Sequence, residues 1–127
     1  MLNGLSLFTG IGGLDVALSE FVRPIAYCEI DSYCQGVLLS NMERKLIVQA
    51  AIWDDIRTLS GTSFPREEID IIYGGFPCQD ISIAGNGAGL GGERSGLFFE
   101  IIRLLRETGS RFLFLENVPA ITRRGGL

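Results

Sequence analysis

The sequence predicts an α/β domain built on a mostly parallel sheet that is flanked by helices. Strand-like apolar runs alternate with helical segments in the order β-α-β-α-β-β-α-β, and the strand-like runs end in glycine-rich or acidic residues. Parallel strands joined by right-handed crossovers produce such an alternation. We expect the first, fourth and fifth strands to be neighbours. We expect a ligand site at the carboxyl ends of the strands, where open α/β sheets bind their ligands.

Composition agrees with one globular domain. The chain has 127 residues, of which 46% are hydrophobic and 20% are charged, so it is long enough for a sizeable core and is not of the disordered class. The mean hydropathy of +0.29 is high for a small soluble domain, which indicates apolar surface that is buried against something else. No apolar run approaches the ~18 residues of a membrane span, and no signal peptide is recognisable, so we expect no membrane association.

The cysteine pattern argues against a metal site or a disulfide framework. Cys28, Cys34 and Cys78 form no C-x-x-C pair, and the chain contains no histidine. Zinc sites and disulfide frameworks need such pairs or partners. We therefore expect no metal and a reducing, cytoplasmic location.

The charge is unevenly distributed. The net charge is −4, although six arginines face only four glutamates from Gly91 onward. A chain that binds DNA phosphates by itself would be more basic. Any affinity for nucleic acid is therefore expected to be local to the C-terminal third or to come from elsewhere.

The first predicted unit is a strand, a glycine turn and a helix. Residues 5–8 form an apolar run, and residues 9–13 form a tight glycine-rich turn. Apolar residues then recur at helical spacing, at Leu14, Ala17, Leu18 and Phe21, and Pro24 closes the segment. This layout is typical of a nucleotide-type cofactor site, because glycines let the backbone approach a ligand. The turn alone is equally typical of a sharp turn without a ligand.

The second predicted unit places an acidic residue at a strand end. Residues 25–28 predict a strand that is followed by Glu29. An acidic residue at this place, roughly 20 residues after the first glycines, is where a ribose diol is held. The alternative is that Glu29 is a solvated strand end. Asp31 or Ser32 can cap the next helix, whose expected inward residues are Tyr33, Cys34, Val37 and Leu38.

The middle of the chain is less clear. Residues 46–53 are apolar and predict a third, edge strand that ends at Asp54 and Asp55. Residues 56–59 predict a turn of helix, and residues 58–66 predict a polar surface loop.

A single cysteine follows the fourth predicted strand. Residues 69–73 form this strand, and Cys78 lies between it and a glycine-rich loop over residues 82–96. A lone cysteine is usually a small buried hydrophobe, and without histidine no Cys–His pair can activate it within this chain. Long loops of this kind are usually lids or binding loops, the alternative being a passive linker.

The last predicted unit is a helix and a strand. Residues 97–107 predict a helix with a charged face formed by Glu100, Arg103 and Glu107. Residues 111–115 predict the last strand, which ends at Glu116.

Three motifs together resemble the cytosine-5 DNA methyltransferase family. Residues 7–13 read Leu-Phe-Thr-Gly-Ile-Gly-Gly, residues 75–79 read Gly-Phe-Pro-Cys-Gln and residues 116–118 read Glu-Asn-Val, in the family's order and spacing. The resemblance covers essentially the whole chain and implies a Rossmann-like domain that binds S-adenosylmethionine. Pro-Cys-Gln in place of Pro-Pro-Cys argues against the RNA-acting branch of the family. A plain NAD-binding Rossmann enzyme would leave these motifs unexplained.

The resemblance implies roles for ten cofactor-binding residues. Glu29 would hold the ribose hydroxyls, and Asp55 would hydrogen-bond the adenine amine. Ile30 would lie against the adenine, and Ile56 would pack on its ring. The other residues that would line the cofactor are Phe8, Gly10, Gly12, Gly13, Pro77 and Leu97.

The resemblance also implies the chemistry. Cys78 would add to C6 of cytosine as a thiolate, which makes C5 nucleophilic toward the sulfonium methyl group. Glu116 would protonate or hydrogen-bond N3, and burial in an apolar pocket would favour the proton that it needs. The base must leave the duplex, and the loop would close over it. The expected DNA contacts on this loop are Gln79, Ser82 and Arg94.

Family members continue well past the Glu-Asn-Val motif. They carry a Gln-x-Arg-x-Arg segment, a variable target-recognition region and a C-terminal helix, none of which is found here. We therefore expect residues 1–127 to be the N-terminal part of a catalytic domain that is incomplete at its C-terminus. Its expected partners are double-stranded DNA and a target-recognition half on the same or a separate chain. The alternative is a catalytically silent fragment that folds, binds cofactor and oligomerises through an uncovered apolar face.

Overall fold

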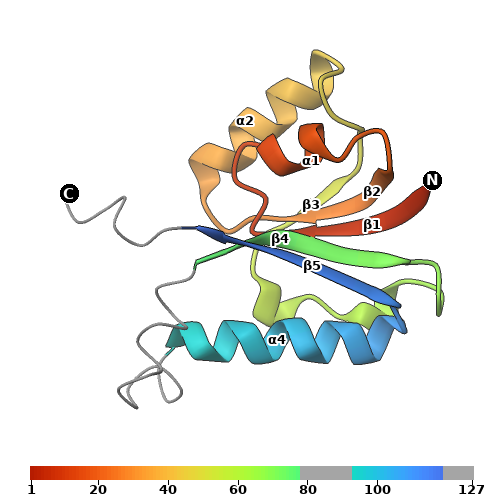
Figure 1. The fold of residues 1–127 in the computed structure, drawn as a ribbon. Helices are drawn as coiled ribbons and strands as arrows, with labels where there is room; N and C mark the ends of the chain where they lie inside the picture. The colour runs from red at the N-terminus through yellow and green to blue at the C-terminus, as the bar shows by residue number, and fades with distance from the viewer. Residues whose placement is uncertain (78–92, 119–127) are drawn as a thin grey trace.

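Five parallel strands form one sheet in the computed structural model, which describes residues 1–77 and 93–118 (Figure 1). The strands are β1 (Leu2–Leu7), β2 (Val22–Cys28), β3 (Ala51–Trp53), β4 (Ile71–Pro77) and β5 (Phe112–Val118). Their order across the sheet is β3-β2-β1-β4-β5. The predicted adjacency of the first, fourth and fifth strands is confirmed.

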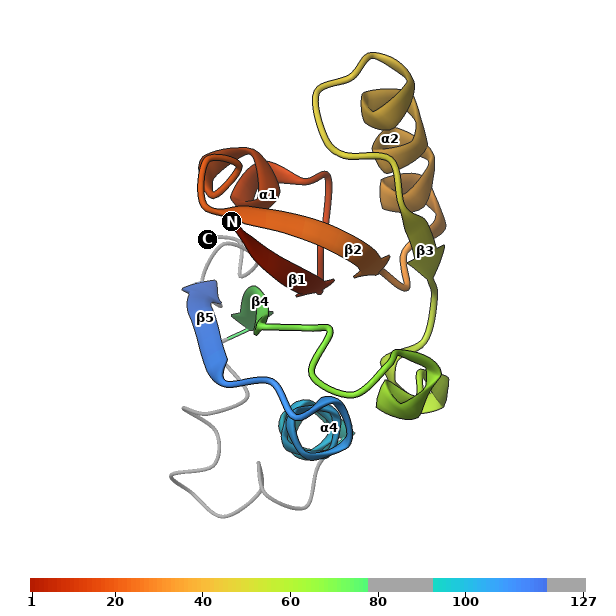
Figure 2. The same ribbon diagram turned by 90° about the vertical axis from the view of Figure 1, so that its right-hand side faces the viewer.

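Helices cover both faces of the sheet. Helices α1 (Gly13–Ala17) and α2 (Ser32–Glu43) lie on one face, and α4 (Glu93–Thr108) lies on the other (Figures 1 and 2). Two short 3₁₀ helices, η1 (Ile56–Thr58) and η2 (Gly61–Ser63), lie beside α4. Helix α2 begins at Ser32 because Oδ2 of Asp31 accepts a hydrogen bond from the backbone N–H of Cys34 at 3.1 Å. The predicted cap is thus confirmed at Asp31.

The hydrophobic core lies mainly between the sheet and α4. Leu5 and Ile72 of the sheet and Ile101 and Leu104 of α4 are all fully buried there. A smaller cluster under α2 is formed by Tyr27, Leu38, Met42 and Ile47. Each buried aliphatic side chain contributes about 1.5–3 kcal/mol, so α4 is the helix that stabilises the sheet most. Among the described residues no helix is long and apolar enough to span a membrane.

Helix α1 is shorter than predicted, and Pro24 does not close it. The helix ends at Ala17, and Phe21 is 64% exposed. Pro24 lies inside β2 and pairs with Gly4, directly before a register shift at which β2 contributes one extra residue, Ile25. A proline that lacks an N–H is accommodated at such an irregularity. Only residues from Ala26 onward pair with β3, so Pro24 faces one neighbouring strand alone.

Strand β4 is displaced from the prediction. The predicted strand covered residues 69–73, whereas β4 runs from Ile71 to Pro77. Gly74 lets the strand continue past residue 73 beside β1, because it has no Cβ. A Cβ added there would lie 2.2 Å from the carbonyl oxygen of Leu7. Only glycine lets β1 and β4 approach so closely at this point.

Further boundaries differ. Strand β1 begins at Leu2 and not at residue 5, and β2 begins at Val22 and not at residue 25. Helix α4 begins at Glu93, so the last four residues of the predicted loop are helical. Strand β3 is an edge strand as predicted, but only its final residues, Ala51–Trp53, are extended. Strand β5 continues past the predicted residue 115 to Val118.

On α2 the prediction of an inward Tyr33 is wrong, since its side chain is 75% exposed, whereas Leu38 is buried.

Candidate functional site

The carboxyl ends of four strands meet along one edge of the sheet. Leu7, the last residue of β1, pairs with Cys28 at the end of β2 and with Gly74 of β4. Gly75 of β4 pairs in turn with Glu116 of β5. The glycine turn, the end of β4 and Glu116 therefore lie along the same edge, as the sequence predicted.

The turn after β1 has a left-handed backbone at three residues. The φ angles are 51° at Phe8, 63° at Gly10 and 95° at Gly12. Glycine adopts such angles freely, but a bulky residue at positive φ costs on the order of 1–3 kcal/mol and often marks a functional site. The backbone N–H of Thr9 donates to the carbonyl of Cys28 at 3.3 Å, which ties the turn to β2. Gly13 has neither a positive φ nor a close neighbour, so the described structure does not require glycine there.

Glu29 joins this turn to the start of α2. Its Oε1 accepts a hydrogen bond from the backbone N–H of Gly10 at 2.7 Å, and its Oε2 accepts one from the N–H of Asp31 at 2.9 Å. The residue is only 9% exposed. The alternative that Glu29 is a solvated strand end is therefore wrong. Carboxylate oxygens have about four lone-pair sites, so Glu29 can accept two more hydrogen bonds from a ligand.

A cavity of about 280 Å³ opens beside Glu29. It contains six of the ten residues predicted to bind the cofactor, namely Phe8, Glu29, Ile30, Asp55, Ile56 and Leu97. The cavity wall does not include Gly10, Gly12 or Gly13, of which Gly10 acts through its bond to Glu29. The side chain of Pro77 lies outside the described residues.

Three residues of the cavity wall were missed by the sequence reasoning. Cys28, Asp54 and Arg57 also line it. Each is a sequence neighbour of a predicted residue, which is the signal that could have found them. Burial, reinforced by the nearby charges of Glu29, Asp55 and Asp54, raises the pKa of the Cys28 thiol to about 12. Cys28 therefore stays protonated and is not a nucleophile.

Asp55 is held ionised by Arg57. Its Oδ1 accepts hydrogen bonds from the backbone N–H of Arg57 at 2.9 Å and from Nε of Arg57 at 3.1 Å. These bonds and the guanidinium charge lower the pKa of the Asp55 carboxyl. With Glu29 and Asp54, Asp55 gives the cavity three carboxylates, while Phe8, Ile56 and Leu97 supply apolar surface. Such a wall suits a ligand with hydroxyl or amine donors and a flat apolar body.

Arg103 of α4 fixes the segment that carries Asp55 and Ile56. Its Nη2 donates to the carbonyl of Ile56 at 2.9 Å, and its Nη1 donates to the carbonyl of Leu59 at 2.8 Å. The same side chain pairs with Glu100 at 2.6 Å and with Glu107 at 2.9 Å. The predicted charged face is thus confirmed, but it packs against η1 instead of facing solvent.

Aromatic rings connect the turn to the strand that precedes Cys78. Phe8 and Phe76 meet edge to face with centroids 5.6 Å apart, and Phe76 and Phe98 do so at 6.1 Å. Such pairs stabilise by about 0.5–1.5 kcal/mol beyond their burial. The end of β4 is therefore fixed relative to both the cavity and α4.

The predicted catalytic and DNA-contacting residues are only partly described. Cys78, Gln79 and Ser82 lie outside the described residues. Arg94 belongs to the first turn of α4, and its side chain is not described. Glu116 is exposed, so the burial that was expected to favour its protonation is absent among the described residues.

The sequence is similar to those of known DNA methylases and methyltransferases. The family profile of the C-5 cytosine-specific DNA methylase matches residues 2–125. The chain is 35% identical to Type II methyltransferase M.CviJI of Paramecium bursaria Chlorella virus IL3A, over 89% of this chain and 29% of that protein. It is 36% identical to Type II methyltransferase M.Bsp6I of Bacillus sp. (strain RFL6), over 93% of this chain and 36% of that protein. The chain thus spans about a third of these relatives' length.

Solved structures agree on the fold. TrmN from Thermus thermophilus superposes with a TM-score of 0.56 at 20% identity, covering 92% of this chain and 33% of its own. An S-adenosylmethionine-dependent methyltransferase from Clostridium acetobutylicum ATCC 824 gives 0.54 at 13% identity, covering 88% of this chain and 41% of its own. The five-stranded parallel sheet is therefore that of S-adenosylmethionine-dependent methyltransferases. With the family profile matching nearly its whole length, the chain belongs to the C-5 cytosine-specific DNA methylase family.

Proposed function

We propose that residues 1–127 are the N-terminal part of the catalytic domain of a DNA (cytosine-5-)-methyltransferase. The observation that carries the proposal is the cavity beside Glu29. It gathers six residues predicted to bind S-adenosylmethionine, at the same sheet edge as Gly75, three residues before Cys78. The similar proteins M.CviJI and M.Bsp6I are named as Type II methyltransferases, and this supports the same reaction class for the chain.

The residues present fit S-adenosylmethionine. Glu29 and Asp55 would accept hydrogen bonds from the ribose hydroxyls and the adenine amine, and Ile30 and Ile56 would pack against the adenine. The cavity volume of about 280 Å³ is near the lower limit for ligand pockets, so it suits the nucleoside end of the cofactor. When bound, the cofactor would supply an electrophilic methyl group.

Cys78 would supply the nucleophile. Its thiolate adds to C6 of a flipped cytosine, and the electron pair displaced from the 5,6 double bond makes C5 nucleophilic. Glu116 would stabilise this charge with a proton or hydrogen bond at N3. After C5 has taken the methyl group, loss of the C5 proton restores the double bond and expels Cys78. Flipping of the base from double-stranded DNA is required because these atoms are stacked within the duplex.

A second chain segment would complete the active site. Glu116 is exposed here, and Phe112 and Phe114 of β5 are 48% and 45% exposed. A C-terminal half, on the same or a separate chain, would cover these groups and choose the DNA sequence. An exposed apolar face beside an open sheet edge is typical of an interaction surface.

A test of the proposal is methyl transfer to duplex DNA by the chain mixed with the C-terminal half of a related methyltransferase. Tritium from labelled S-adenosylmethionine should appear in DNA only when both parts are present. A mixture that binds cofactor and DNA but transfers no methyl group would sink the proposal.

The exposed face of β5 also favours a second candidate, a silent module that binds cofactor and self-associates. In that case Phe112 and Phe114 would be covered by a second copy. Light scattering separates the two: a dimer that Phe114→Ser dissociates, without any transfer in the mixture, would favour the silent module.

A further inference from the structure

Arg57 holds both carboxylate oxygens of Asp55 in the wall of the cavity beside Glu29. Its Nε donates a hydrogen bond to Oδ1 of Asp55 at 3.1 Å, and its Nη2 donates one to Oδ2 at 3.3 Å. The backbone N–H of Arg57 donates a further hydrogen bond to Oδ1 at 2.9 Å. Two parallel bonds between a guanidinium and a carboxylate fix the geometry of the pair. The orientation of the Asp55 carboxylate is therefore set by the Arg57 side chain.

These bonds leave Asp55 one acceptor position for a ligand. An ionised carboxylate has about two lone-pair sites on each oxygen. Both sites of Oδ1 are used by the backbone N–H and Nε of Arg57, whereas Oδ2 accepts only the bond from Nη2. The side chain of Asp55 is 28% exposed and lines the cavity, so it is accessible to a ligand there. The position that remains for a ligand donor is therefore on Oδ2.

The backbone around Asp55 is held by groups other than the Arg57 side chain. The N–H and the hydroxyl of Thr58 donate to the carbonyl of Asp55 at 2.9 Å and 3.0 Å. Arg103 donates to the carbonyl of Ile56 at 2.9 Å. The Arg57 side chain instead acts on the carboxyl of Asp55, and its hydrogen bond is the largest cause that lowers the pKa of this group. An ionised Asp55 accepts hydrogen bonds and donates none.

We propose that Arg57 is a positioning residue that makes the cavity selective for purines with an exocyclic amine. It holds Asp55 so that Oδ2 accepts one hydrogen bond from that amine. A purine that lacks the amine leaves this position without a donor, and a purine with an oxo group in its place brings a second acceptor against it. The inference rests on the proposed function, because the adenine of S-adenosylmethionine is the purine concerned.

Two nucleosides, adenosine and purine riboside, test this role because they differ only in the exocyclic amine. Each is titrated into isotope-labelled protein, and binding is followed by the backbone amide chemical shifts. The wild type should bind adenosine about tenfold more tightly than purine riboside. Arg57→Gln should lower this preference about threefold, because the complex must then immobilise the Asp55 side chain. The loss should fall on adenosine alone, whereas a merely structural role of Arg57 would weaken both nucleosides equally.

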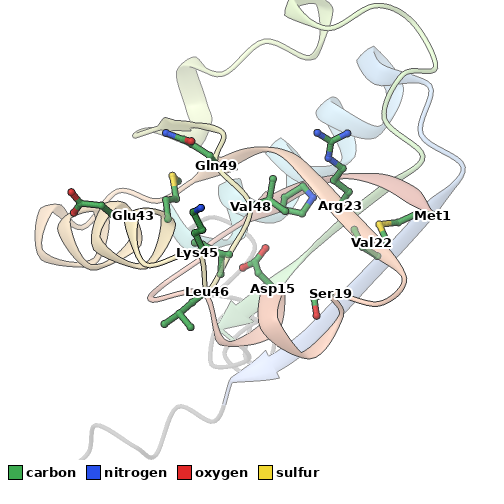
Figure 3. A pocket seen from close by; sticks show the side chains of 13 residues that line it. Met1, Asp15, Ser19, Val22, Arg23, Glu43, Lys45, Leu46, Val48 and Gln49 are labelled. Carbon is green, nitrogen blue, oxygen red and sulfur yellow. The ribbon is translucent and has the colours of Figure 1, made fainter.

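Two further variants separate geometry from charge. Arg57→Lys keeps the positive charge but cannot hold both oxygens, so it should lose the preference as Arg57→Gln does. The control is Arg23→Gln, which should keep the wild-type preference. Arg23 is an exposed arginine that lines a separate cavity of about 630 Å³ (Figure 3), and this cavity shares no lining residue with the one beside Glu29.

The outcomes distinguish this inference from the proposed function. Equal affinities of the wild type for the two nucleosides would overturn the selectivity, even if the Arg57 variants fail to fold. A wild-type preference in Arg57→Gln or in Arg57→Lys, or an equal loss for both nucleosides, would contradict the positioning role alone. A wild-type chain that does not bind adenosine would contradict the proposed cofactor cavity, and this inference with it.

Discussion

The sheet edge that carries the site has a β1–β2 end and a β4–β5 end. This chain completes the first end further than the second. At the β1–β2 end, Glu29 is buried and accepts hydrogen bonds from two backbone amides, Gly10 and Asp31. At the β4–β5 end, Glu116 is exposed, and Phe112 and Phe114, which lie earlier on β5, are exposed as well. The groups proposed to bind the cofactor are thus fixed by contacts between short segments of this chain. The groups proposed to act on the base depend on a surface that the described residues do not provide.

The largest expected effect concerns the base-modifying end. Cys78→Ala should reduce methyl transfer in the reconstituted mixture by about 10⁴-fold or more, because the nucleophile is lost. S-adenosylmethionine affinity should stay within about twofold, since Cys78 is proposed to act on the base and the cofactor is proposed to bind in the cavity beside Glu29. Tritium transfer and calorimetry measure the two quantities. Transfer that persists in this variant would rule out Cys78 as the nucleophile.

The strand that joins the two ends should be intolerant of a side chain at Gly74. A Cβ there would lie 2.2 Å from the carbonyl oxygen of Leu7. Gly74→Ala should therefore lower the free energy of unfolding by about 3 kcal/mol or more. Gly36 lies inside α2 with no neighbour within 4 Å of an added Cβ, so Gly36→Ala should stabilise by up to about 1 kcal/mol. Urea denaturation measures the free energy of unfolding of both variants. Equal changes in Gly74→Ala and Gly36→Ala would contradict the described pairing of β1 with β4.

Arg103 should influence the cofactor end from α4. Arg103→Gln removes its hydrogen bonds to the carbonyls of Ile56 and Leu59. We expect a loss of about 1.5–3 kcal/mol in the free energy of unfolding, and about fivefold weaker cofactor binding because Asp55 and Ile56 lose their support. Arg106→Gln, at an exposed position of the same helix, should change neither quantity. Unaltered affinity in the Arg103 variant would show that η1 is held by other contacts.

The smallest expected effect is a pH dependence at Asp15. Burial raises the pKa of its carboxyl above the ordinary value of 3.8. Between the pKa of Asp15 in the unfolded chain and its higher pKa in the folded protein, the folded protein binds more protons than the unfolded chain. The free energy of unfolding therefore falls as the pH rises through this range. Asp15→Asn should flatten this fall. Unfolding measured from about pH 4 upward checks it, and identical slopes for both proteins would contradict a buried, titrating Asp15.

The sequence predicted six residues that line the cavity beside Glu29, because several of them follow strand ends. Glu29 and Asp55 each come directly after or close to a predicted strand, and such positions meet at one edge in a parallel sheet. The partners of these groups were not predictable in the same way. The bonds from Arg103 to η1 join residues more than forty positions apart, and no local pattern encodes them.

Element boundaries failed where tertiary contacts override local preference. Pro24 was expected to end a helical segment, but the register shift between β1 and β2 accommodates it inside β2. Gly74 and Gly75 were expected to end a strand, but the close approach of Leu7 makes glycine a requirement within β4. Tyr33 was expected inside, yet its side chain on α2 is 75% exposed.

The central claim is that the cavity beside Glu29 binds S-adenosylmethionine through that carboxylate. Calorimetric titration of the chain, of Glu29→Ala and of the exposed control Glu43→Gln tests it most directly. We expect saturable binding by the wild type, about 30-fold weaker binding or more by Glu29→Ala, and unchanged binding by Glu43→Gln. Light scattering on the same samples should show a monomer. Equal affinities of the wild type and Glu29→Ala, with both folded, would contradict the account.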